Sequence, residues 1–190
     1  AFSGPLLAIG LESSGVVIFD VTDSSLPVEL GRTPSSPIAG MSIAGDTLYA
    51  ATGDRVATWD ISVPASPMLV DEYQVAASVR TIRVGLDRGL IMTGSGTEVV
   101  SRAEGGNLSR LTVLDARRAE DGIIAGDRIF LADGYRGLRV FDIGPEGLVR
   151  ELTAWSGGYA ARIARSGETV FFTDSRIVGV IEVIVPPWLE

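Results

Sequence analysis

The sequence predicts an all-β fold, a β-propeller built from about five four-stranded repeats of about 41 residues. Three observations support this prediction. One tight-turn motif returns along the chain at nearly constant spacing, short runs of alternating apolar residues flank each copy, and no segment of useful length has helical periodicity. A period near 40 residues is typical of propeller blades. The 190 residues are therefore expected to form a single domain.

The repeat is anchored on a glycine–acid turn that joins two strands. Its clearest copies are Ala44–Tyr49, Ala125–Phe130 and Ser166–Phe171, and Leu86–Ile91 is a looser one. The acids of these turns lie 41, 40 and 41 residues apart, at Asp46, Asp87, Asp127 and Glu168. One further step back reaches Pro5, so the approximate repeats are 1–35, 36–77, 78–117, 118–158 and 159–190.

Each repeat has room for four strands, and the first two form a hairpin because glycine supplies the positive φ of a tight turn. The expected first strands, innermost in a propeller, are 38–44, 79–84, 122–125 and 160–165. The second strands are expected at 6–10, 47–52, 89–93, 128–132 and 169–173. Third strands end in apolar–acid pairs at 19–20, 59–60, 141–142 and 181–182. Fourth strands follow a turn, often with proline, at 27–31, 67–73, 108–115 and 148–154.

Both ends of the chain are expected to carry incomplete repeats. The first repeat has no room for its first strand before Leu6, and the fifth stops at Glu190, about where its fourth strand would begin. Either the ring closes with two incomplete blades, or the chain is part of a larger ring, and the second alternative is favoured. Because an unpaired blade edge invites strand addition, pairing with another chain through the terminal blades is also expected.

Charge and missing residue types exclude several functions. The net charge of −8, from 16 basic and 24 acidic residues, argues against nucleic-acid binding, which needs a basic face. The chain has no cysteine and no histidine, so it lacks thiolates, the usual general base and the commonest metal ligand. Its most apolar tail, 177–188, contains Glu182 and is too short to span a membrane as a helix. No cofactor is expected.

The best copy of the repeat carries a family resemblance. Residues 124–143 read IAGDRIFLADGYRGLRVFDI, and residues 43–62 match this pattern more weakly as IAGDTLYAATGDRVATWDIS. The first segment resembles the LVIVD repeat of bacterial β-propeller proteins. The resemblance implies a propeller fold and a secreted, periplasmic or cell-surface location, and it implies no defined biochemical role. The single Trp59-Asp60 pair does not indicate a WD40 protein, since a second pair and a Gly-His partner are both missing.

One end of the expected propeller gathers the candidate binding residues. Loops joining second to third strands meet there with loops that lead from a fourth strand into the next repeat. The candidates for a ligand or partner site are Asp54, Arg55, Asp133, Tyr135, Arg136, Asp174, Arg176 and Tyr159. The same end also carries Glu12, Arg117, Arg118, Glu120 and Asp121. Tyrosine and arginine are enriched at binding hot spots, although a solvated surface has a similar composition. The preferred function is a non-catalytic scaffold that presents this charged face to a protein or saccharide partner.

Acidic residues leave one enzymatic alternative open. The acids that end the third strands, Asp20, Asp60, Asp142 and Glu182, are expected to cap turns rather than to bind metal. The loop 133–137 supplies only one of the oxygen ligands of a calcium loop. Glycoside cleavage, however, needs only two carboxyl groups. A carboxylate-dependent hydrolase would use Asp133 together with Asp54 or Asp174 at the channel mouth.

Overall fold

The structure, a computed structural model, describes residues 1–11, 14–34, 36–144, 147–167, 169–173 and 178–182. Its strands form five antiparallel sheets, named I to V here in chain order. Sheet I contains β1 (Phe2–Ser3), β2 (Leu6–Leu11), β3 (Gly15–Asp20) and β4 (Val28–Arg32). Sheet II contains β5 (Gly40–Ala44), β6 (Thr47–Thr52), β7 (Arg55–Asp60) and β8 (Met68–Gln74).

The remaining three sheets repeat this order. Sheet III contains β9 (Val79–Val84), β10 (Arg88–Thr93), β11 (Thr97–Arg102) and β12 (Leu108–Leu114). Sheet IV contains β13 (Asp121–Ala125), β14 (Arg128–Ala132), β15 (Leu138–Ile143) and β16 (Val149–Trp155). Sheet V contains β17 (Arg162–Ser166), β18 (Thr169–Thr173) and β19 (Val178–Glu182).

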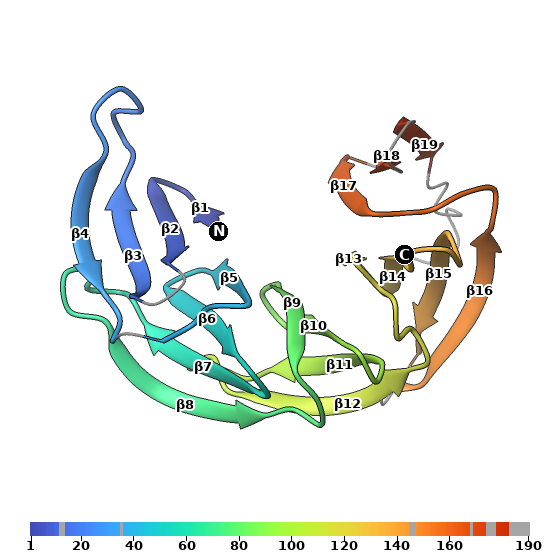
Figure 1. Cartoon of the computed structure of the whole chain (residues 1–190), viewed down its shortest axis with the longest axis horizontal. Helices are drawn as coiled ribbons and strands as arrows, with labels where there is room; N and C mark the ends of the chain where they lie inside the picture. Colours follow the sequence, from blue (N-terminus) through green and yellow to red (C-terminus); the bar gives the residue numbers. More distant parts are fainter. Residues whose placement is uncertain (12–13, 35, 145–146, 168, 174–177, 183–190) are drawn as a thin grey trace.

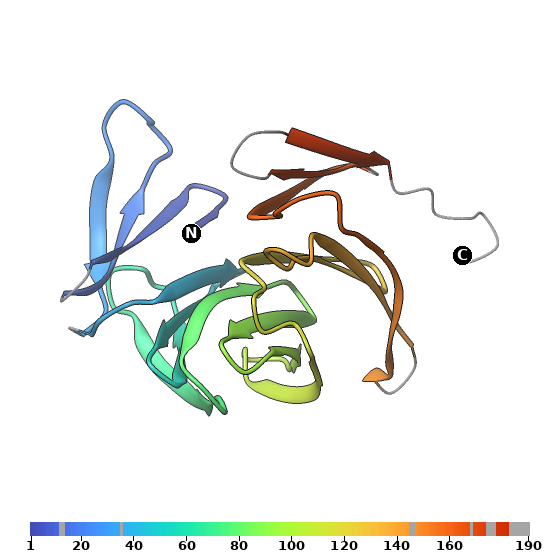
Figure 2. The same ribbon diagram turned by 45° about the vertical axis from the view of Figure 1, so that its right-hand side comes forward.

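The five sheets stand side by side in an open crescent (Figure 1). Strands within a sheet are hydrogen-bonded in chain order, and the fourth strands β4, β8, β12 and β16 run along the outer side (Figure 1). Sheets I and V form the two ends of the crescent, and the turned view shows the same opening between them (Figure 2). The all-β class and the repeated four-stranded sheets are therefore as predicted, and the described residues form a propeller-like arc rather than a closed ring.

The predicted strand positions are confirmed closely, and one prediction is wrong. The strands β6, β9, β14 and β18 have the expected bounds. A first strand was not expected before Leu6, yet β1 pairs with β2 through Phe2↔Leu7 and Ser3↔Leu6. This short hairpin is possible because Gly4 has a φ of 56°, so that Gly4 and Pro5 turn the chain within two residues.

Two backbone features recur because the sequence motif recurs. The glycine of the anchor turn has positive φ in three sheets, with values of 59° at Gly45, 57° at Gly126 and 55° at Gly167. The pairing of third with fourth strands shifts register at one equivalent place in sheets I to IV, immediately before Phe19, Trp59, Val100 and Phe141. Such bulges bend a strand and increase its twist, which suits the curved outer strands of the crescent.

The core lies between neighbouring sheets, because side chains alternate between the two faces of each strand. Between sheets I and II, the buried Ile18 packs in one cluster with Leu48 and Ile61. The next cluster joins sheets II and III through Tyr49, Val56, Ile82, Ile91 and Val100. Sheets III and IV share Leu90, Met92, Ile129, Leu131 and Phe141, and sheets IV and V share Phe130, Leu138, Ile163, Val170 and Phe172.

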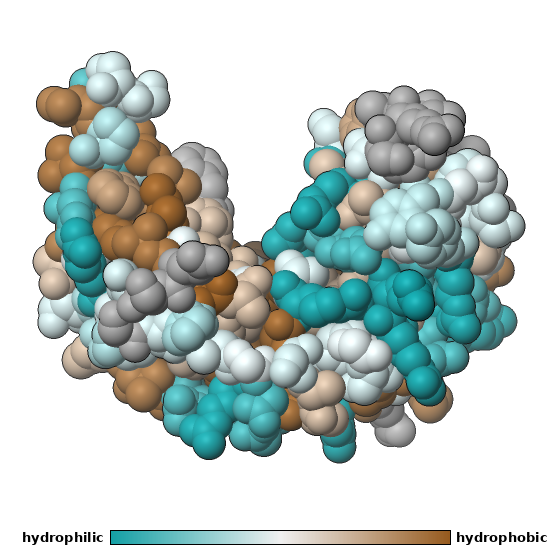
Figure 3. Space-filling model, viewed as in Figure 1, coloured by the Kyte–Doolittle hydropathy of each residue, from teal (hydrophilic) through white to brown (hydrophobic). Residues whose placement is uncertain are grey.

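Sheet I carries one apolar face that no described sheet covers. On this face Ile9 of β2 pairs with Val17 of β3. The equivalent pair in sheet III is Ile91 with Glu98. Ile91 is fully buried against sheet II, whereas Ile9 is 41% exposed. The space-filling view shows hydrophobic surface over the arm formed by sheet I (Figure 3). The face is open at Ile9, whereas its partner Val17 is only 3% exposed. It has the composition of an inter-sheet contact but lacks a covering sheet within the described part of the chain.

The matched isoleucines test this difference. Replacing Ile91 by alanine should lower the free energy of unfolding by about 2–5 kcal/mol, because it leaves a cavity between two sheets. The Ile9→Ala change should cost less than half as much, since its side chain is already partly in water. Urea unfolding of both variants and of the unmodified chain measures the two costs. Equal costs would show that the outer face of sheet I is covered in solution.

Candidate functional site

Loops of two kinds meet at one end of the crescent, as the sequence predicts. In sheet II, the backbone N–H of Val79 donates to the Gly53 carbonyl at 2.7 Å, which ties the entry of sheet III to the β6–β7 corner. In sheet IV, Gly134 and Ala160 exchange two backbone hydrogen bonds of 3.1 and 2.9 Å. These bonds place the β14–β15 corner beside the segment that enters sheet V. This end, the corner face, holds the candidate residues that the structure describes.

The corner of sheet IV is built around a buried ion pair. Asp133 is completely buried, and its Oδ2 accepts a 2.8 Å hydrogen bond from the Arg139 guanidinium. Arg139 reaches Glu151 on the outer strand through two more bonds, of 3.0 and 2.7 Å. It also donates to the Asp115 carbonyl at the end of sheet III. The hydrogen bonds from Arg139 lower the pKa of Glu151, and those to Glu151 contribute most to raising the pKa of Arg139.

Asp133 is therefore buried rather than exposed at the corner as the sequence predicts. The sequence puts it among exposed corner residues, whereas the structure buries it beneath the corner. Its second carboxylate oxygen, Oδ1, is buried and has no hydrogen-bond partner among the described residues. Its backbone N–H donates to the Gly137 carbonyl and its carbonyl accepts from Arg136 N–H, so the residue closes the turn. Asp133 and Arg139 together hold the shape of the corner.

Tyr135, Arg136 and Tyr159 form the exposed part of this corner. Tyr135 is 77% exposed, and its ring meets the Tyr159 ring edge-on with 4.9 Å between the centroids. The Tyr159 hydroxyl donates to Glu120 Oε1 at 3.0 Å, a bond that raises the pKa of Tyr159 because it stabilises the neutral phenol. The Arg136 guanidinium donates to the Asp115 carbonyl at 2.9 Å. Three of the predicted residues are thus brought together and held in place.

An arginine-rich pocket lies beside this corner. It has a volume of about 240 Å³ and is lined by Asp115, Arg117, Arg118, Asp133 and Arg136. Arg117 and Arg136 both contact the Asp115 carboxylate, whereas the Arg118 guanidinium has no hydrogen bond or ion pair with any residue that the structure describes. The sequence predicts Arg117 and Arg118 at this end of the fold but does not mark them as binding candidates. The only signal in the sequence is their position on the two sides of a repeat boundary.

The other predicted residues lie elsewhere. Asp54 sits at the β6–β7 corner, where its carbonyl accepts bonds from Val75 N–H and the Gln74 side chain. Arg55 is paired with Glu72 on the neighbouring strand at 3.6 Å. These two residues belong to sheet II, so they are not part of the Tyr135 corner. Asp174 and Arg176 fall outside the described residues.

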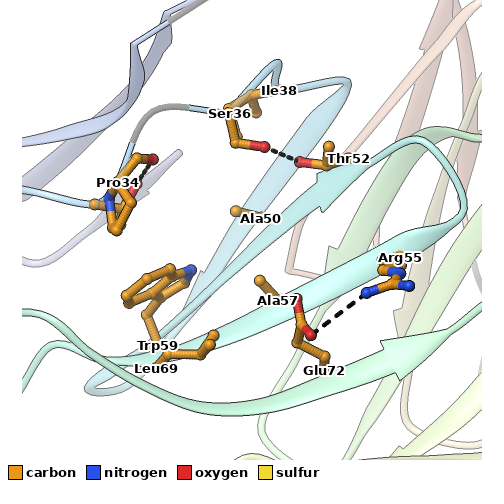
Figure 4. A pocket seen from close by; sticks show the side chains of 11 residues that line it. Pro34, Ser36, Ile38, Ala50, Thr52, Arg55, Ala57, Trp59, Leu69 and Glu72 are labelled. Atoms are coloured by element: carbon orange, nitrogen blue, oxygen red, sulfur yellow. Dashed lines mark hydrogen bonds and ion pairs between the residues drawn. The ribbon is translucent and has the colours of Figure 1, made fainter.

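A second pocket opens beside Arg55, over β6, β7 and β8 of sheet II and next to the link that leads there from sheet I (Figure 4). Its volume is about 170 Å³. It is lined by Thr33, Pro34, Ser36, Ile38, Ala50, Thr52, Arg55, Ala57, Trp59, Leu69 and Glu72. Of these residues only Arg55 is a candidate from the sequence. Trp59 stands in the sequence only as half of a Trp-Asp pair, because the spacing of residues does not reveal a hollow over a sheet.

The acids that end the third strands are partly as expected. Asp20 Oδ1 accepts bonds from the N–H and hydroxyl of Thr22, and Asp60 Oδ1 accepts from Ser62 N–H. These bonds lower the pKa of both acids, as expected for turn caps. The Asp142 carboxylate accepts no hydrogen bond from a described residue, and residues 145–146 of the turn that follows it lie outside the description, so the cap stays a prediction there. The side chain of Glu182 lies outside the description.

The described residues form neither a metal-binding cluster nor a membrane-spanning helix. Within those ranges, no three histidine, cysteine, aspartate or glutamate side chains are grouped so that they could hold a metal ion. No helix in the same ranges is long and apolar enough to cross a membrane.

Comparison with known proteins identifies the fold but no family. No protein-family model and no curated protein matches the chain, so the LVIVD resemblance stays a prediction. A functionally unknown protein from Desulfotomaculum acetoxidans superposes with a TM-score of 0.78 at 14% identity, over 95% of this chain and 63% of that one. A protein from Lactobacillus plantarum gives 0.69 at 14% identity, with 93% and 65% covered. The computationally designed Ika8 protein gives 0.67 at 14% identity, with 96% and 57% covered.

These likenesses concern the fold alone, because the identities are low. The chain spans about three-fifths of the length of the three solved proteins just described.

Breaking the buried Asp133–Arg139 ion pair should lower the stability of the fold. Replacing Arg139 by methionine leaves the Asp133 carboxylate buried without a cation, which should lower the free energy of unfolding by about 3–5 kcal/mol. An Asp133→Asn change added to Arg139→Met should recover part of this loss, since the buried charge is removed. Arg136→Met, at a half-exposed arginine of the same corner, is the matched control and should change stability little. Urea unfolding that gave equal losses for the two arginines would contradict this account.

Proposed function

We propose that the chain is a non-catalytic, propeller-like binding module that presents the corner face to a protein or saccharide partner. The observation that carries the proposal is the construction of the Tyr135 corner. An exposed tyrosine and arginine stand on a turn that the buried Asp133–Arg139 pair keeps rigid. Exposed aromatic and arginine side chains on a preorganised support are typical of binding hot spots, because little conformational entropy is lost on binding.

The geometry gives the hydrolase alternative little support. A glycosidase needs two carboxyl groups that both reach the sugar. The Asp133 carboxylate is buried and bonded to Arg139, so it is not available to a substrate at the surface. Its proposed partner Asp54 belongs to a different sheet. The neighbourhood of Asp133 is explained by its structural role in the turn.

A second contact is proposed for the uncovered face of sheet I. Leu7, Ile9, Val17 and Phe19 lie on that face as cross-strand pairs, at the repeat positions through which sheets II to IV contact the preceding sheet. Continuity with these established contacts suggests that the face packs against another copy of the chain. The corner face then stays free for a ligand, because it lies at the end of the sheets and not on their flat sides.

Binding arrays test the main proposal. Printed arrays of glycans and of peptides should retain the chain on a subset of ligands, and that binding should weaken about tenfold or more in Tyr135→Ala and Arg136→Ala. Arg150→Ala, which changes an exposed arginine on the outer strand β16, should bind like the unmodified chain. Hydrolysis of chromogenic glycosides by the unmodified chain, lost in Asp133→Asn, would overturn the proposal in favour of the hydrolase.

Light scattering tests the self-contact. The apparent mass should rise from 20.0 kDa towards twice that value as the concentration increases. The Ile9→Arg variant should stay monomeric, since a charge in the middle of the face opposes burial. A monomer that persists at millimolar concentration would contradict the self-contact and would leave the corner-face proposal untouched.

A further inference from the structure

The pocket on sheet II lies where two cross-strand partners, Ala50 and Ala57, are both alanine. Ala50 stands where sheets III and IV have Ile91 and Leu131, and Ala57 stands at a second repeat position. This second position lies on the third strand of each sheet and pairs with the second strand. It is Arg139 in sheet IV, Glu98 in sheet III and Ala57 in sheet II. Glu98 is buried and accepts a 2.7 Å hydrogen bond from Tyr73 of the preceding sheet. Arg139 likewise reaches back to the Asp115 carbonyl. Ala57 has only a methyl group, and a hollow of about 170 Å³ remains beside it.

The hollow has an apolar floor and a polar rim (Figure 4). The floor consists of Ala50, Ala57, Leu69 and the half-buried Trp59. Its size is close to the ~150 Å³ of an engineered cavity that admits benzene, so it has room for one six-membered ring. A longer drug-like molecule would need about 300 Å³ or more.

The rim decides which kind of ring fits. Glu72 supplies acceptors and Arg55 supplies donors, at a pair separation of 3.6 Å that is longer than a hydrogen bond. On the other side lie the Ser36 and Thr52 hydroxyls, 3.0 Å apart. The Trp59 indole N–H has no partner among the described residues. The ring edge that carries this N–H faces Ala50 and Ala57 (Figure 4).

A ring that suits both parts must have an apolar face and hydrogen-bonding groups around its edge. A benzene-like side chain would meet the floor but would leave the rim groups unused. The rim is also electrically balanced, because Arg55 and Glu72 carry opposite charges, so it does not favour an acidic sugar over a neutral one. We propose that this pocket binds a neutral pyranose residue of a saccharide, with its C–H groups on Trp59 and Leu69. This inference rests on the proposed function and narrows its partner to a saccharide held beside the corner face.

Ligand-detected NMR tests the inference on the intact chain. The probes are methyl glucoside, methyl galactoside and methyl mannoside, with methyl glucuronide and N-acetylphenylalanine amide as comparisons. At least one neutral pyranoside should receive saturation from the protein, bind more tightly than N-acetylphenylalanine amide, and bind at least as tightly as methyl glucuronide. Ala57→Leu, which fills the hollow, and Glu72→Gln, which weakens an acceptor, should each raise the Kd about tenfold. Arg150→Ala, at an exposed arginine of the outer strand β16, should leave the Kd unchanged.

The outcomes separate this inference from the proposed function. If Ala57→Leu disturbs packing in a thermal melt, Glu72→Gln decides, because Glu72 is half-exposed and its replacement leaves the fold intact. Failure of every neutral pyranoside to bind, or binding insensitive to both variants, overturns the pocket assignment. Stronger binding of the phenylalanine amide overturns it too and assigns the hollow to a peptide side chain. Glycan binding that depends on Tyr135 and not on Glu72 also overturns it, while the corner-face proposal stands.

Discussion

Apolar packing between the facing sides of consecutive sheets is the interaction on which the rest of the structure depends. Each sheet carries apolar side chains on both faces, so it is stabilised by its neighbours on either side. Side chains alternate along every strand, and the same strand therefore serves two contacts. Leu48 faces sheet I while the adjacent Tyr49 faces sheet III. A register error of one residue would exchange the two faces and disrupt both contacts at once.

Charged side chains are placed where they connect one sheet to the next. Arg102 of sheet III donates to the Tyr49 hydroxyl at 2.7 Å and to the Ala44 carbonyl of sheet II at 3.3 Å. Arg139 and Glu98 make comparable contacts near the corner face. Such bonds are directional, so they fix how far one sheet is rotated against another, which the apolar contacts alone leave free. The corner loops, and with them Tyr135, are positioned by these links.

The functional proposals follow from departures from the repeat. Where the repeat is regular, a position does the same work in each sheet and carries no information about a ligand. Ala57 departs from Glu98 and Arg139, and it leaves a hollow with an aromatic floor. The Tyr135 corner departs from the corner at Asp54 by its exposed aromatic ring and its buried ion pair. A nearly regular scaffold of this kind can acquire binding sites by single substitutions, because the surrounding packing is unchanged.

The sequence by itself determined the class of fold, the period and the bounds of most strands. These are local properties: alternation follows from strand geometry, and the turns at Gly45, Gly126 and Gly167 follow from the freedom of glycine to take positive φ. Only the tertiary structure decided which residues meet between sheets. It buried Asp133, an aspartate in a turn that the sequence presents as exposed, because Arg139 lies beside it on the next strand. It also opened the pocket over Trp59, since the volume over a sheet depends on side chains far apart in the sequence.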